Sequence, residues 1–147
     1  MGLKKLEKKL IGEILLDEGH VEAEEIKKAL QIQRQQGGLI GEIMVREGWL
    51  TEEQLMMALS KQLSLPFIQL SNYKVNRSAS KVIPREIAER YSMFPFDEDE
   101  KDIFIATCEP ENEDAMEEVR KRARLITQIF LATPAEIRKA IGKFYGG

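Results

Sequence analysis

The chain has 147 residues, of which 43% are hydrophobic and 32% charged, a composition typical of a globular protein rather than a disordered one. A formal net charge of −3 without any basic stripe argues against binding to nucleic acid. The single cysteine, Cys108, excludes an intrachain disulfide, which fits the cytosol. No apolar run approaches the length of a membrane-spanning helix, and the basic N-terminal segment lacks the apolar region of a signal peptide.

The first half of the chain contains an internal repeat. Residues 10–33 read LIGEILLDEGHVEAEEIKKALQIQ, and residues 39–62 read LIGEIMVREGWLTEEQLMMALSKQ. The two segments align without a gap at an offset of 29 residues, and 11 of 24 positions are identical. Such self-similarity indicates two copies of one supersecondary unit.

Each copy has the pattern of two short helices. The first helix is predicted to end at Gly19 or Gly48, because glycine readily adopts a left-handed backbone. The second is predicted to begin near Glu22 or Thr51, and Thr51 with Gln54 matches a capping box. Helical spacing places an apolar stripe on one face of each second helix, at Ile26, Ala29 and Leu30 in the first copy and at Leu55, Ala58 and Leu59 in the second.

Two features of each copy have both a functional and a structural interpretation. Gly12 and Gly41 fall at or inside the first helix, where glycine costs up to about 1 kcal/mol relative to alanine. They indicate a backbone that another group must approach closely, or else a helix N-terminus or a tight helix crossing. Gln33 and Gln62 follow the apolar stripe on the same helix face. Each is either buried, in which case its amide needs a hydrogen-bond partner, or caps a helix end at the surface.

The second half of the chain mixes strand and helix patterns. A strand entered through a proline turn, a polar loop, and a helix with Pro84 near a helix start are predicted at residues 64–70, 71–77 and 78–91. A hairpin follows, then a charged helix and a third strand, at residues 93–96 with 102–107, 112–125 and 126–132. Thr133 as N-cap, Pro134 and Glu136 predict the start of a final helix that ends near Tyr145.

These patterns predict an α+β fold. Residues 1–63 form an all-helical tandem-repeat subdomain, and residues 64–147 form a small mixed α/β subdomain. Because each half alone is small for a self-sufficient core, we expect the helical repeat to pack on the second subdomain. The sequence does not indicate the oligomeric state.

No catalytic or metal-binding constellation is found in the sequence. His20, the only histidine, falls in a turn, and one histidine with one cysteine is too few for a usual zinc site. The acidic run 97–102 lacks the spacing of a calcium loop and is typical of a solvated hairpin tip. The only Gly-Lys pair, Gly142-Lys143, lacks the upstream glycine of a phosphate-binding loop. We therefore predict that the chain is not an enzyme.

The repeat and several later motifs resemble the N-terminal domain of type II secretion ATPases and type IV pilus assembly ATPases. The similarity runs through both repeats and the Leu65-Pro66-Phe67 joint, and through residues 83–88 and 131–146. It implies a non-catalytic docking or regulatory domain, with the chain ending near the point where the ATPase core follows in that family. The family does not distinguish secretion from pilus assembly.

In one branch of that family the duplicated motif binds cyclic di-GMP, which is the possible ligand that the resemblance implies. The motif maps onto Leu10, Ile11, Gly12, Leu15, Ile26, Leu30 and Gln33 in the first copy, and onto Leu39, Ile40, Gly41, Met44, Leu55, Leu59 and Gln62 in the second. The family motif opens with arginine, whereas this sequence has Leu10 and Leu39, which offer neither charge nor hydrogen-bond donors.

The resemblance also implies a partner. In the family this domain docks onto the cytoplasmic part of inner-membrane platform proteins, so we expect a cytoplasmic protein held at the inner membrane through that partner. Exposed apolar surface around Leu10, Leu39 and Trp49 is the candidate contact, although Trp49 also fits a core position between the two repeats.

Overall fold

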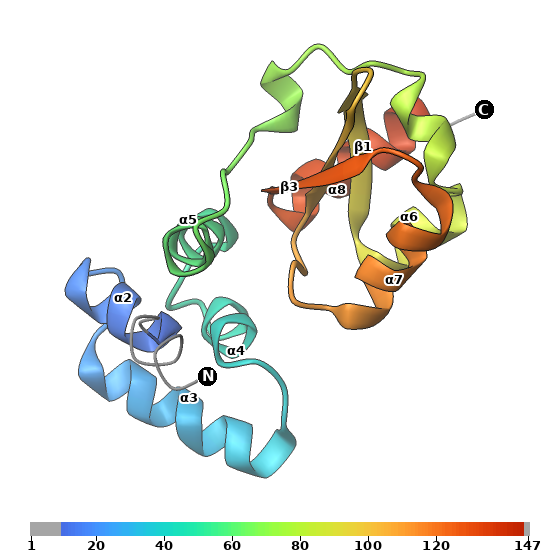
Figure 1. The fold of residues 1–147 in the computed structure, drawn as a ribbon. Coiled ribbons are helices and arrows are strands. Elements are labelled where there is room, and N and C mark those ends of the chain that lie inside the picture. Colours follow the sequence, from blue (N-terminus) through green and yellow to red (C-terminus); the bar gives the residue numbers. More distant parts are fainter. Residues whose placement is uncertain (1–9, 146–147) are drawn as a thin grey trace, which may run out of the picture. The chain divides into compact units, whose positions relative to one another are not determined.

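The computed structural model describes residues 10–145, so the expectation about the basic N-terminal segment lies outside the described residues. The described chain has the predicted α+β fold and forms two compact units, divided between Ser64 and Leu65 (Figure 1). The packing of one half on the other stays a prediction. Within the described residues, no helix combines the length and apolar character needed to cross a bilayer.

The helical unit contains one short and one long helix from each copy of the repeat. The first copy forms α2 (Ile11–Asp17) and α3 (Ala23–Gln36), and the second forms α4 (Ile40–Arg46) and α5 (Glu52–Leu63). Gly19 and Gly48 follow the short helices with φ of 74° and 84°, which confirms the predicted left-handed helix ends.

Capping boxes begin both long helices. In α5 the Thr51 hydroxyl accepts a bond from the Gln54 amide, and the Gln54 side chain accepts one from the Thr51 amide, both at 3.0 Å. This arrangement confirms the predicted start of the helix. In α3 a pair of carboxylates, Glu22 and Glu25, performs the same exchange, which the sequence pattern did not predict.

The two copies pack reciprocally. The short helix of each copy contacts the long helix of the other, α2 against α5 and α4 against α3, and the two short helices also touch. Ala29 and Ala58, at matching positions of the long helices, are fully buried. The predicted stripe is only partly internal, because Leu30 is 37% exposed whereas its counterpart Leu59 is half-buried.

The second unit is built on a three-stranded sheet with the order β1-β2-β3. The strands are β1 (Met93–Glu98), β2 (Asp102–Thr107) and β3 (Ile126–Leu131). β1 and β2 form the predicted antiparallel hairpin, and β3 lies parallel to β2. The parallel pairing requires a crossover, which α7 (Glu113–Arg122) provides.

Helices α6 (Arg85–Tyr91), α7 and α8 (Pro134–Phe144) complete this unit. Its core includes the fully buried side chains of Phe94 and Ile105. The Thr133 hydroxyl accepts a bond of 3.2 Å from the Glu136 amide, and Pro134 opens α8, so the predicted helix start is confirmed.

Three predicted elements differ from the structure. The strand at 64–70 reduces to one bridge between Phe67 and Leu131, and the chain then forms a 3-10 turn, η1 (Leu70–Asn72). The helix at 78–91 is interrupted after η2 (Ala79–Val82), because a residue before proline, here Ile83 with ψ of 123°, favours extended backbone.

The third correction concerns the charged helix. It ends at Arg122 rather than at residue 125, because Ala123 already has extended backbone with ψ of 126°. Cys108, interpreted from the sequence as a buried small side chain, is only half-buried where β2 ends.

Candidate functional site

The two leucines that replace arginine in the duplicated motif occupy equivalent exposed positions. Leu10 and Leu39 are the N-cap residues of α2 and α4, and they are 67% and 68% exposed. Exposure of a leucine side chain leaves apolar surface in water, which contributes nothing to the fold. Each copy therefore presents an uncovered apolar side chain at the start of its short helix.

The two residues that follow each of these leucines are less exposed than the leucine itself. Ile11 and Ile40 are half-buried, Gly12 is half-buried and Gly41 is buried. A Cβ placed on Gly41 would lie 2.5 Å from Cδ1 of Leu55, whereas one on Gly12 would lie 3.9 Å from Cδ1 of Ile26. Of the interpretations left open by the sequence, a tight helix crossing therefore describes Gly41.

The remaining aliphatic positions of the motif divide between core and surface. Leu15 and Met44 are completely buried, and Leu55 is 6% exposed, so these three side chains belong to the core of the helical unit. Ile26 and Leu59 are half-buried, and Leu30 is exposed. The predicted site thus combines residues that can contact a ligand with residues that hold the helices together.

The glutamines that close the two copies lie near the ends of the long helices. The Gln33 side-chain amide donates a bond of 3.0 Å to the Gly38 carbonyl in the loop between the copies. Gln33 is half-buried, and this bond gives its side-chain amide a partner in the loop beyond α3. Gln62 is half-buried in the last turn of α5.

A charged cluster links the first copy to the second and was not predicted. Lys61 of α5 forms an ion pair and hydrogen bond with Glu18, which follows α2, and His20 Nε2 lies 3.4 Å from the same carboxylate. The hydrogen bond from Lys61 is the main cause of a lowered Glu18 pKa. The only sequence signal for this cluster is the matching of charge signs 43 residues apart, which no local pattern contains.

The acidic run 97–102 includes the end of β1, the hairpin turn at residues 99–101 and the first residue of β2, so the predicted turn is shorter than the run. The Asp99 carboxylate accepts bonds from the amides of Asp102 at 2.7 Å and Lys101 at 2.9 Å. These donors lower the Asp99 pKa. Among residues 10–145, no group of three metal-ligating side chains is brought together. The carboxylate is thus engaged in shaping the turn.

Trp49, a candidate contact residue, is half-buried, so it is neither a core residue nor a fully exposed one. Leu10, Leu39 and the reciprocal packing of the two short helices are the features that define the candidate site. The fold and the repeat together define the chain as an α+β domain with a duplicated helical motif.

Residues 63–147 match the model of the MshEN domain, which is more than half of the chain, so the chain belongs to the MshEN domain family. The matched domain is the N-terminal part of secretion and pilus ATPases and is separate from their catalytic domain. The residues of this chain therefore form a non-catalytic domain and not an enzyme. The resemblance to this family that the sequence motifs indicated is confirmed.

The curated relatives include two type IV pilus assembly ATPases named PilB. The chain is 29% identical to that of Myxococcus xanthus over 135 residues and 32% identical to that of Thermus thermophilus over 139 residues. These alignments include 92% and 93% of this chain. The chain spans only 24% and 16% of the lengths of the two relatives.

The solved structures extend the similarity to the helical unit. A structure of MshE with cdg superposes with a TM-score of 0.83 at 27% identity, and covers 94% of this chain and 100% of that one. The N-terminal domain of XpsE has the same fold in two crystal forms, with TM-scores of 0.73 and 0.63 at 17% and 19% identity. Each covers 92% of this chain and 94% of that one.

Proposed function

We propose that the chain is a non-catalytic docking domain of a type IV pilus or type II secretion ATPase system. Its partner is the cytoplasmic part of an inner-membrane platform protein, so the domain works at the cytoplasmic face of that membrane. The observation that carries this proposal is the exposure of Leu10 and Leu39 at equivalent positions of the two copies. Exposed apolar side chains on a folded domain are typical of protein interaction sites.

The distribution of exposed apolar side chains supports the same unit as the docking surface. Seven large hydrophobic side chains are exposed among the described residues, and five of them lie in the helical unit. These five are Leu10, Leu16, Leu30, Leu39 and Met57. The described part of the larger α+β unit exposes only Tyr73 and Ile126, so the greater number in the helical unit does not follow from the sizes of the units.

The test is a binding measurement with purified cytoplasmic segments of the platform proteins from the source organism. We expect the double substitution Leu10→Gln, Leu39→Gln to weaken binding while the circular dichroism spectrum stays unchanged. Ile126→Gln, at a 63% exposed position of the other unit, is the matched control. Equal loss in both variants, or no binding of the unmodified domain to any platform segment, would contradict the proposal.

Cyclic di-GMP binding is the second candidate function, and a separate observation favours it. We take the cdg of the MshE structure to be cyclic di-GMP, and that structure shares the fold of both repeats with this chain. A ligand with two identical halves suits two copies that pack reciprocally. The leucines at 10 and 39 cannot donate the charge-assisted bonds of arginine, each of which contributes about 1.5–3 kcal/mol. We therefore expect weak affinity.

Calorimetric titration of the domain with cyclic di-GMP tests this candidate. Little or no heat from the unmodified domain, and a clear isotherm from Leu10→Arg, Leu39→Arg, would identify a sensor fold whose ligand site has lost its arginines. Tight binding by the unmodified domain, abolished by Gln33→Ala, would make the nucleotide the primary ligand. No heat of binding from either protein would rule out cyclic di-GMP as a ligand of this domain.

A further inference from the structure

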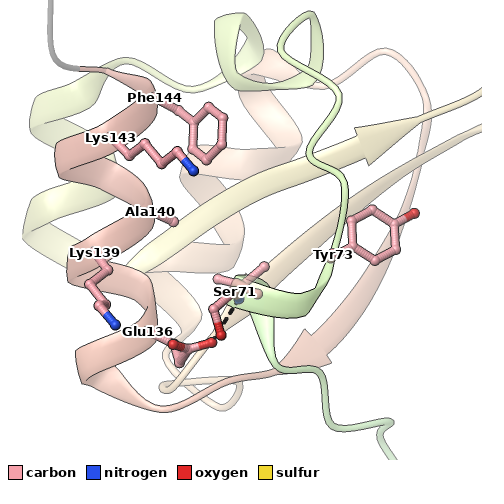
Figure 2. Close-up of a pocket in the computed structure, with 8 residues that line it drawn as sticks. Ser71, Tyr73, Glu136, Lys139, Ala140, Lys143 and Phe144 are labelled. Carbon is pink, nitrogen blue, oxygen red and sulfur yellow. Dashed lines mark hydrogen bonds between the residues drawn. The ribbon is translucent and has the colours of Figure 1, made fainter.

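Two hollows meet at Phe144, at the end of α8 in the α+β unit. The first has a volume of about 420 Å³ and lies between η1 and α8, with Tyr73, Lys139 and Lys143 in its lining (Figure 2). The second has a volume of about 610 Å³ and is lined by Arg77 and Lys81, among others. Phe144 lines both, and we call the two hollows together the basic groove.

Five cations line the basic groove, and one of them, Arg85, pairs with Glu89 at 3.4 Å, whereas the other four are not neutralised within the described chain. Among residues 10–145, no ion pair joins Arg77, Lys81, Lys139 or Lys143 to a carboxylate. The basic side chains of α7 behave differently, since Arg120, Lys121 and Arg122 all pair with acids of their own helix. The unpaired cations of the groove therefore differ from those of α7, whose charges are already paired within their own helix.

An aromatic ring orients two of these cations in place of an acid. The Arg77 guanidinium carbon lies 4.9 Å from the centre of the Phe144 ring, and Lys143 Nζ lies 5.3 Å from it. The ring is held in turn by Phe94, with centroids 5.7 Å apart. Cation–π contacts use the face of the ring and leave the N–H donors of the cations available to a ligand.

One acid lines the groove, and its position is fixed. Glu136 Oε1 accepts a bond of 2.9 Å from the Ser71 amide, which ties η1 to the first turn of α8 (Figure 2). Ala140, one turn further along α8, gives the first hollow an apolar floor beside Lys139 and Lys143. The groove therefore combines a cationic rim with an apolar and aromatic base.

We propose that the basic groove binds an acidic peptide segment of a partner protein, with carboxylates on the four cations and an apolar side chain in a hollow beside Phe144. Charge complementarity selects this occupant, because the chain has a net charge of −3 and only a local cluster can attract an acidic ligand. A flat anionic bilayer would meet the rim cations but leave both hollows unfilled. The proposal goes beyond the docking function above and uses residues of the other unit.

Fluorescence anisotropy with the full chain tests the proposal. The probe is a short labelled peptide of alternating glutamate and phenylalanine, and glutamine replaces every glutamate in the matched control peptide. We expect Lys139→Gln, Lys143→Gln and Arg77→Gln, Lys81→Gln each to weaken binding about three- to tenfold, as two surface charge contacts would. Arg120→Gln, Lys121→Gln removes the same charge from α7 and is expected to have little effect.

The outcomes separate the groove from general electrostatics. Binding of the glutamate peptide alone, weakened by the groove variants and by added salt, supports the proposal. Equal binding of the glutamine peptide, or equal loss in the α7 variant, overturns it. Groove-dependent sedimentation with phosphatidylserine vesicles but no peptide binding also overturns it, in favour of a membrane surface. If Arg77→Gln disturbs the fold, the exposed Lys139 and Lys143 pair still decides the question.

Discussion

Gly41 of α4 lies directly against Leu55 of α5, so close that no Cβ fits between them without displacing the leucine. The equivalent pair in the first copy, Gly12 and Ile26, leaves room for ordinary van der Waals contact. The repeat has kept glycine at both positions, but in this structure only the second copy needs it for packing.

This difference predicts opposite effects of one substitution. Gly41→Ala is expected to destabilise the domain by about 1–2 kcal/mol, since overpacking costs about 1–3 kcal/mol and alanine recovers up to about 1 kcal/mol of helix propensity. Gly12→Ala is expected to be neutral or stabilising. Urea denaturation followed by the fluorescence of Trp49, the only tryptophan, measures both. Similar destabilisation by the two variants would mean that close packing is not the reason for the glycines.

The capping box of α5 predicts that removing the Thr51 hydroxyl lowers the stability of the domain. Thr51→Ala removes the acceptor of the Gln54 amide and is expected to cost about 1 kcal/mol. Thr51→Ser keeps the hydroxyl and is expected to retain most of the stability. The same Trp49 denaturation curves provide the measurement, and a serine variant as unstable as the alanine variant would show that the methyl group matters more than the cap.

The hydrogen bonds to Asp99 predict a contribution to folding stability that depends on acid pH. The amides of Asp102 and then Lys101 stabilise its carboxylate, so its folded-state pKa lies below the ordinary value of 3.8. The folded state thus releases this proton more readily than the unfolded chain. The stabilisation is present above the unfolded pKa and is lost as pH falls through the folded pKa.

NMR titration of the carboxyl carbons measures this shift directly. In Asp99→Asn we expect a smaller loss of stability on acidification than in the unmodified protein. Glu100→Gln, at an exposed position of the same turn, is the control and should leave the Asp99 titration nearly unchanged. An Asp99 pKa at or above 3.8 would contradict the hydrogen-bonding account.

The hydrogen bond of Tyr73 predicts a loss of folding stability at high pH. Its hydroxyl donates to the Asp97 carboxylate, and this bond, followed by desolvation, raises the Tyr73 pKa above 10.0. A raised pKa means that the contribution to stability is present below the unfolded pKa and disappears as pH rises through the folded one. Ultraviolet titration, with Tyr73→Phe to identify its component, should show a lower Tyr73 pKa in Asp97→Asn. No change in that variant would contradict the assignment.

The elements that the sequence predicted well are those with local chemical signals. Gly48, Thr51 with Gln54, and Thr133 with Pro134 mark helix ends through groups within a few residues of one another. Such signals do not depend on the rest of the fold. The helix at 78–91 was wrong because the effect of Pro84 on the residue before it outweighed the helical pattern.

The candidate site was less predictable because burial depends on long-range packing. The family motif implied both Leu15 and Leu30 as ligand contacts, but the structure buries the first and exposes the second. The ion pair between Glu18 and Lys61 joins residues whose pairing no short window contains. The basic groove likewise joins Arg77 to Lys143 through a ring contact that the sequence does not signal.

The reciprocal packing of α2 on α5 and α4 on α3 makes each copy of the repeat the structural complement of the other. A single copy alone would leave the fully buried Ala29 or Ala58 without its covering helix. Two identical single copies could supply the missing contacts to each other as an isologous pair, which is the symmetry of a homodimer. The present chain therefore has the form of a dimer joined end to end. Its Gly37-Gly38 loop, with φ of 74° and 96°, is the connection that makes the two halves one chain.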